Sequence, residues 1–197
     1  MTAASLHLSD FEIDALFERL LHIDGKAEIV DGRIVVMSPT GAWPSLVASL
    51  IFISLQKHAR GRRNHYAVND NCTFRADLPN RQSFSPDAAY FIGASPKMGP
   101  FAGAPVFAVE VRNIGDYGPR AEELIAAKRA DYFAAGTQVV WDVDLLSNDV
   151  VKVYRAASPD TAVVYRWGDT AEAEPAVAGW AIAVNDILPD DWEPPKP

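Results

Sequence analysis

The chain has 197 residues, of which 49% are hydrophobic and 22% are charged, proportions that are ordinary for one globular domain. Its single cysteine, Cys72, excludes an internal disulfide bond and a zinc site made of several cysteines. The formal net charge of −8 excludes a protein whose whole surface is basic, so contact with nucleic acid would depend on a local basic patch.

The N-terminal residues and the hydropathy of the chain bear on its location. The first twelve residues lack the basic start and the apolar block of a secretory signal. No apolar run approaches the ~20 residues that a helix needs to cross a bilayer. We therefore expect a cytoplasmic protein that has no membrane partner.

Capping and turn residues mark the elements of the first half. Ser9 or Asp10 can cap a helix that runs to about Leu21. Apolar runs on either side of Asp31-Gly32 predict a β-hairpin over residues 28–37 with a type I′ turn. Helical apolar spacing predicts a helix that Gly61 ends. The further elements expected here are this helix over about 44–59 and strands over about 65–74 and 87–92.

The second half begins with an almost continuous apolar run over residues 105–111, which is typical of a central strand covered on both faces. Pro119 opens a long helix that stops at Gly136. This order of elements predicts a mixed α/β or α+β fold, with one domain over residues 1–187 and an irregular tail rich in proline and acid over residues 188–197. Further strands are expected over residues 138–143, 149–154, 162–167 and 176–184.

Two carboxylates are expected at the ends of apolar strands, where burial of a charge is unfavourable. Glu110 lies near the end of the central apolar strand, and Asp87 stands at the start of another apolar run. A buried carboxylate costs several kcal/mol unless it is paired, protonated or bound to a metal. If the two strands are neighbours, both carboxylates can bind one Mg²⁺ or Mn²⁺ ion. The alternative is that each acid caps a turn or pairs with an arginine.

Two cations are candidates for the same site. Helical spacing places Lys128 on one stripe with Leu124 and Tyr132, the face that packs inward. Strand alternation places Arg112 on the same face as Glu110. Either cation could stabilise the charge that develops on a phosphate group, and a lysine could also assist an attacking water.

An ordered set of segments resembles the Uma-type restriction endonucleases, a branch of the PD-(D/E)xK nuclease superfamily. The resemblance covers residues from about Asp10 to Tyr154 and implies a restriction-endonuclease-like fold, in which helices flank a central mixed β-sheet. The segments are residues 28–39, Ser85-Pro86-Asp87, Val109-Glu110-Val111, Lys128-Arg129, Tyr132, Gly136 and residues 139–143.

The resemblance also implies a metal-dependent endonuclease that hydrolyses DNA. Asp87 and Glu110 match the metal ligands of the motif. Our mechanistic hypothesis adds the main-chain carbonyl of Val111 as a further ligand. Lys128 matches the lysine that this branch places on the helix after the glutamate strand. Glu28 matches an acidic position before the hairpin turn, and it joins Arg112 among the candidate catalytic residues.

Other functions stay open at this point. The acidic balance, and residues 112–116 where the family has a proline-containing polar segment, favour a catalytically silent nuclease fold that binds nucleic acid or protein. A glycosidase-like pair of acids is a third reading. The basic cluster over residues 56–65 could contact phosphates, or it could complement a helix C-terminus. A homodimer would suit the cutting of both strands of a duplex.

Overall fold

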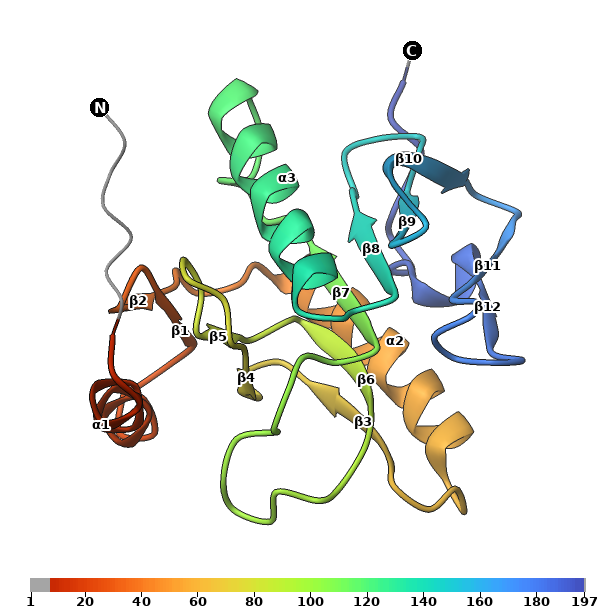
Figure 1. The fold of residues 1–197 in the computed structure, drawn as a ribbon. Coiled ribbons are helices and arrows are strands. Elements are labelled where there is room, and N and C mark those ends of the chain that lie inside the picture. The colour runs from red at the N-terminus through yellow and green to blue at the C-terminus, as the bar shows by residue number, and fades with distance from the viewer. Residues whose placement is uncertain (1–7, 197) are drawn as a thin grey trace.

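The computed structural model describes residues 8–196, which are built around a six-stranded mixed sheet (Figure 1). The strands of this sheet are β3 His65–Asn69, β6 Ala88–Ile92, β7 Phe107–Val111, β8 Val139–Val143, β9 Val151–Arg155 and β10 Ser158–Tyr165. They lie in the order β10-β9-β8-β7-β6-β3, and of the neighbouring pairs β7 and β8 run parallel while the others run antiparallel. The expected central position of the apolar run at β7 is confirmed.

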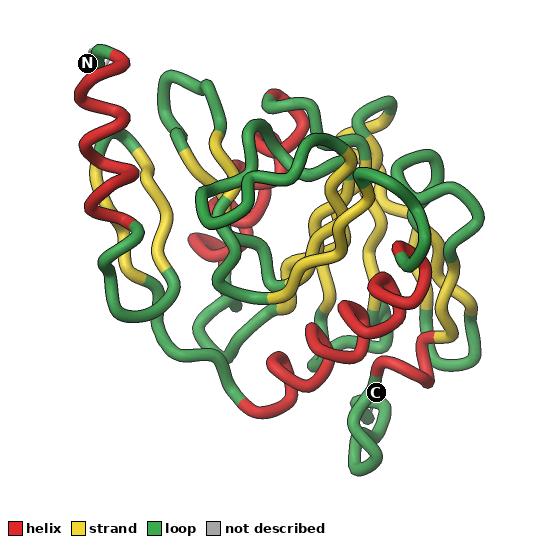
Figure 2. The backbone as a smooth tube through the Cα atoms, turned by 90° about the horizontal axis from the view of Figure 1, so that it is seen from below, coloured by secondary structure: helices red, strands yellow, loops and turns green. Residues whose placement is uncertain are grey.

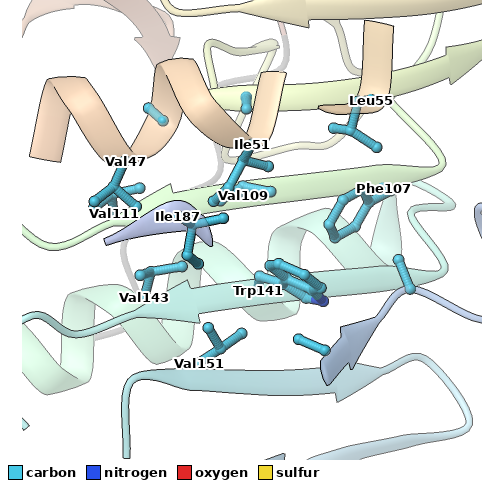
Figure 3. Close-up of a cluster of buried hydrophobic side chains, with 14 of the residues drawn as sticks. Val47, Ile51, Leu55, Phe107, Val109, Val111, Trp141, Val143, Val151 and Ile187 are labelled. Carbon is cyan, nitrogen blue, oxygen red and sulfur yellow. The ribbon is translucent and has the colours of Figure 1, made fainter. Parts of the chain in front are cut away.

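Two long helices cover opposite faces of the sheet. Helix α3 (Pro119–Ala134) connects the parallel strands β7 and β8 and lies in front of them in Figure 1. Gly118, with φ 94°, makes the turn into this helix, a backbone conformation that side chains disfavour. Helix α2 (Ala42–Ala59) packs on the other face, where its Val47 and Ile51 meet Val111 and Val109 of β7 (Figure 3).

The N-terminal elements form a smaller layer beside the sheet. Helix α1 (Asp10–Leu20) lies along the hairpin of β1 (Ala27–Val30) and β2 (Arg33–Val36), as Figure 2 shows. Asp31 and Gly32 have φ values of 48° and 67°, as a type I′ turn requires. Strand β1 is hydrogen-bonded to the segment that connects β3 and β6, because the amide of Gln82 in this segment donates to the carbonyl of Ile29 over 3.0 Å. The hairpin is therefore held against one end of the sheet.

Several expected boundaries differ from the structure. The strand expected over 65–74 is broken, because the chain turns at Asn71 (φ 63°) and continues as β4 (Phe74–Arg75), which pairs with β5 (Ser83–Phe84). The strand expected over 176–184 is wrong for most of its length. A turn through Gly179 (φ 74°) precedes β12 (Ala181–Ala183), which pairs with β11 (Thr170–Glu172).

The remaining elements lie near the expected positions. Helix α2 begins two residues before Pro44, because a proline in the first turn needs no backbone N–H. The 3₁₀ helix Val184–Ile187 leads into the tail. Over the described residues 188–196 the tail has no helix or strand, as expected, yet Leu188 and Trp192 are buried in the main core. None of the described helices has the length and apolar character needed to cross a membrane.

Candidate active site

Strands β6 and β7 bring Asp87 and Glu110 to the same end of the sheet. Asp87 directly precedes β6, and its amide donates to the carbonyl of Val109 over 3.0 Å. Its side-chain Oδ2 accepts the amide of Val111 over 2.7 Å. Because β6 and β7 are antiparallel neighbours, the start of one lies beside the end of the other. Both acids line one cleft of about 870 Å³.

Helix α3 supplies the next two side chains. Lys128 places its Nζ 2.9 Å from Oε1 of Glu110, and the hydroxyl of Tyr132 donates to the same oxygen over 2.7 Å. Lys128 and Tyr132 are four residues apart, so they lie on one face of the helix. Tyr132 is fully buried and stacks on Phe84 with ring centroids 4.1 Å apart. Packing of this ring therefore sets the position of the glutamate.

Glu28 of β1 stands behind Lys128 and outside the cleft lining. Its Oε1 lies 3.0 Å from Nζ of Lys128 and accepts the amide of Ser85 over 2.9 Å. Its Oε2 accepts a 2.5 Å hydrogen bond from Arg81, whose Nε also donates to Asp131 over 2.8 Å. Only 2% of the surface of Glu28 is exposed, and its contact with the candidate site is the one with Lys128.

Lys26 is a member of the site that sequence reasoning missed. Its Nζ lies 2.5 Å from Oδ1 of Asp87 and 2.7 Å from Oδ1 of Asp70. Arg81 was missed as well. One signal could have found Lys26: it stands two residues before Glu28, and alternation along an extended chain puts both side chains on one face.

The charges of the site act on one another. Burial raises the pKa of Asp87, and so does the charge of Glu110, although Lys26 opposes this. Burial also raises the pKa of Glu110, but the charges of Lys128 and Lys26 and the hydrogen bond from Tyr132 hold it below its ordinary value.

The pKa values of Lys26 and Lys128 are raised, whereas that of Glu110 is lowered. Burial lowers the pKa of Lys26, yet Asp87 and Glu110 raise it above its ordinary value overall. Lys128 behaves in the same way, with Glu110 and Glu28 as its raising charges. The site therefore keeps two ammonium ions beside its carboxylates at neutral pH.

Arg112 lines the same cleft but has other partners. Its Nε and Nη2 donate to Asp142 over 2.7 and 2.8 Å, and its Nη2 and Nη1 donate to Glu122. Its guanidinium is engaged by these two acids, and the contacts found in residues 8–196 do not join it to Asp87 or Glu110. The expectation that Arg112 could serve as the cation of the site is therefore not met.

The basic cluster over residues 56–65 lies away from the cleft. The cleft is lined by Gly41 at the start of α2, whereas the cluster lies at the end of that helix. An α-helix of 18 residues is roughly 27 Å long. His65 at the start of β3 pairs with Ile92, the far end of β6 from Asp87. The cluster therefore does not flank the candidate site, and cations at this helix end complement its dipole.

The sequence matches the model of the family Uma2, described as "Putative restriction endonuclease", over residues 14–185. The chain belongs to the Uma2 family. In this Uma2 chain Asp87, Glu110 and Lys128 all lie inside the matched region, as does the whole six-stranded sheet. The resemblance inferred from the ordered segments is thereby confirmed.

A solved structure has the same fold. It is the crystal structure of a putative nuclease belonging to DUF820 from Anabaena variabilis, with a TM-score of 0.66 and 17% sequence identity. The match covers 87% of this chain and 96% of that chain. At this identity the likeness shows the fold, which confirms the expected nuclease-like mixed sheet flanked by helices. No curated protein matches the chain.

The residues of this Uma2 chain fit a divalent metal of the kind that restriction-endonuclease-like families generally use. Within residues 8–196 no group of three or more His, Cys, Asp or Glu side chains could hold a metal, so Asp87 and Glu110, which line one cleft, are the carboxylates considered. Mg²⁺ is often held by one or two carboxylates, with water and substrate phosphate as its other ligands. Oδ1 of Asp87 already faces a cation, the ammonium of Lys26, so this donor set accepts positive charge. Val111, the expected carbonyl ligand, lines the same cleft.

Proposed function

We propose that this Uma2 chain hydrolyses phosphodiester bonds of DNA with Mg²⁺ or Mn²⁺ bound between Asp87 and Glu110. Family membership supports a nuclease role. The observation that carries the proposal is the meeting of two carboxylates from neighbouring strands with Lys128, whose Nζ lies 2.9 Å from Glu110 at the wall of one cleft. All three residues line that cleft, which supports the proposal.

Each side chain has a role that follows from its contacts. Asp87 and Glu110 would hold the metal, together with the main-chain carbonyl of Val111. A bound divalent ion makes water more acidic and withdraws charge from a phosphate group. Lys128 points into the cleft region beside Glu110, where its charge can orient water or offset the negative charge that develops on the phosphate.

Two further residues keep this arrangement in place. Glu28 forms an ion pair with Lys128, and its own carboxylate accepts hydrogen bonds from Arg81 and from the amide of Ser85. Tyr132 fixes one oxygen of Glu110. These residues position the catalytic groups and need not touch the substrate. A homodimer would let two such sites cut both strands of a duplex, and analytical ultracentrifugation would show whether it forms.

The proposal is tested by metal binding and DNA cleavage in parallel. We expect the wild-type protein to bind Mn²⁺ in a calorimetric titration and to cleave DNA, and Glu110→Gln to lose both. Glu123→Gln is the matched control, because this residue is exposed on α3 and lies outside the cleft lining. If Asp87→Ala cleaves DNA with Mn²⁺ as well as the wild type does, the proposed mechanism is wrong.

One observation favours a second function, that of a catalytically silent fold that binds nucleic acid or protein. Lys26 holds Asp87 at 2.5 Å, so the buried carboxylate is neutralised without any metal. Such a protein would bind DNA or a protein partner with no Mn²⁺ present and would give no heat with Mn²⁺ alone. Calorimetry of the wild type with Mn²⁺ therefore separates the two functions.

A further inference from the structure

Both oxygens of Asp87 are engaged, each by a different segment of the chain. Oδ2 accepts the amide of Val111 over 2.7 Å, which ties the side chain to β7. Oδ1 lies 2.5 Å from Nζ of Lys26, which reaches in from the residue before β1. The side chains of Lys26 and Asp87 are only 12% and 11% exposed. A divalent ion at Oδ1 would therefore meet an ammonium ion on the same oxygen.

Glu110 differs from Asp87 in this respect. The contacts from Lys128 and Tyr132 both go to its Oε1. Within the described residues 8–196 no hydrogen bond to its Oε2 is found. Over these residues Glu110 thus has one oxygen to which no hydrogen bond is found, whereas both oxygens of Asp87 are engaged, one of them by a cation. A metal ion would therefore compete with a cation of the protein, Lys26, for an oxygen of Asp87.

Lys26 has a second partner that can keep it. Asp70 lies in the turn after β3, and its Oδ1 is 2.7 Å from Nζ of Lys26. Its side chain is 43% exposed, and it is not among the residues that line the cleft. An ammonium that leaves Asp87 can therefore remain paired with Asp70 while it gains contact with water.

We propose that Lys26 is a built-in competitor of the divalent metal: its ammonium holds Oδ1 of Asp87 in the metal-free protein and passes to Asp70 when the metal binds. The inference rests on the proposed role of Asp87 as a metal ligand. Two cations on one carboxylate oxygen repel each other strongly in a partly buried site. The metal must therefore displace Lys26 before it can use this oxygen.

This arrangement has a consequence for folding as well as for metal binding. An unpaired buried carboxylate is strongly destabilising, and Lys26 supplies the missing charge in the metal-free state. The fold consequently does not depend on the metal, and the apparent affinity for the metal is lowered by the strength of the Lys26 pair. The site would load only above a threshold concentration of the divalent ion.

The test is a double-mutant cycle on Mn²⁺ affinity, measured by calorimetry on the full chain. We expect Lys26→Gln to bind Mn²⁺ roughly tenfold more tightly than the wild type. Asp70→Asn should weaken binding several-fold in the wild-type background, because Lys26 then loses its second partner. In the Lys26→Gln background the same change should have an effect of about twofold or less.

Matched controls separate displacement from a general effect of charge. Lys57→Gln removes an exposed lysine at the end of α2, away from the cleft, and should leave the affinity for Mn²⁺ unchanged. Circular dichroism checks the fold of each variant. If Lys26→Gln does not fold, Lys26→Met carries the same expectation, since it also removes the charge while keeping the length of the side chain.

The outcomes distinguish a failure of the competition by Lys26 from a failure of the proposed metal site. Equal or weaker Mn²⁺ binding by the Lys26 variants overturns the competition and leaves the metal site standing. An equal effect of Asp70→Asn in both backgrounds overturns the transfer to Asp70, because that aspartate then acts by its charge alone. If neither the wild type nor any Lys26 variant binds Mn²⁺, the metal role of Asp87 fails, and the inference fails with it.

Discussion

Two charged clusters lie side by side at the end of β7, and they differ in what they leave open. Around Arg112, one guanidinium is shared by the carboxylates of Asp142 and Glu122, and each of its three nitrogens donates a hydrogen bond. Around Glu110, Lys128 and Tyr132 engage one oxygen, and no hydrogen bond to the other is found over residues 8–196. The first cluster is closed and the second is open toward the cleft.

The difference between these clusters lies in how fully each charged group is paired within the protein, and this separates structural charges from functional ones. Arg112 and Glu110 are two residues apart, and both line the cleft. The hydrogen bonds that Arg112 donates to Asp142 raise the pKa of Arg112 further, although burial opposes this, so its charge is permanent and already matched. Both are charged residues near the end of β7, so their place in the sequence does not show which charge is matched within the protein. The partners that the fold provides to each side chain show it.

The largest expected effect comes from breaking the closed cluster. Arg112→Met leaves Asp142, which is 3% exposed, without its partner. Removing one member of a buried ion pair costs about 3–5 kcal/mol, and we expect a loss of that size in the free energy of unfolding. Urea denaturation measures it.

The closed cluster has its own control. Arg112→Met combined with Asp142→Asn should recover part of the stability, because the buried charge is then removed along with its partner. A single variant that unfolds at the urea concentration of the wild type would mean that the cluster adds nothing to stability. The conclusion that the cluster around Arg112 is structural would then be wrong.

A somewhat smaller effect is expected at the open cluster, and on a different measurement. Lys128→Gln removes the charge beside Glu110, and removal of one such group lowers the rate of the chemical step by about 10²–10³. DNA cleavage under single-turnover conditions measures this rate. Mn²⁺ affinity should stay the same or increase, because the variant has one positive charge fewer near the site.

Lys57→Gln is the matched control for Lys128→Gln, since it removes an exposed lysine at the far end of α2. Equal losses of cleavage in the two variants would show that the lysines contribute only to DNA attraction in general. A loss of Mn²⁺ binding in Lys128→Gln would instead assign this residue to the integrity of the site.

The smallest effect is expected at the exposed edge of the closed cluster. The hydrogen bond from Arg112 lowers the pKa of Glu122 below its ordinary value of 4.5, although burial opposes this. Because the pKa is lower in the folded state, the contribution to stability is complete above pH 4.5 and is lost as the pH falls through the folded value. Its side chain is 53% exposed, so Glu122→Gln should cost less than about 1 kcal/mol at neutral pH.

Thermal unfolding of the wild type and Glu122→Gln at a series of pH values measures this contribution. The difference between the two proteins should be constant near neutral pH and should disappear below the pKa of the folded state. A difference that grows as the pH falls would contradict the sign of the shift.

Sequence patterns alone brought together three residues of the candidate site. A continuous apolar run predicted the central strand that carries Glu110, and a second run predicted the strand that begins after Asp87. That the two strands are neighbours was a condition of the prediction, and the fold meets it. Helical periodicity placed Lys128 on the inward face of α3, where it contacts Glu110. These inferences succeeded because each depends on a local rule: the covering of a central strand, or the turn of a helix.

Tertiary structure alone decided the partners. Lys26 reaches Asp87 across 61 residues of sequence, and Arg81 reaches Glu28 across 53. Strand alternation predicts Arg112 on the same face as Glu110, but in the fold Arg112 directly follows β7 and pairs with Asp142 of β8 and Glu122 of α3. No local periodicity encodes such pairs, because which charges meet depends on how the hairpin, the sheet and the helix dock together. The sequence determined where charged groups would gather, and the fold decided which of them are matched and which remain open to a ligand.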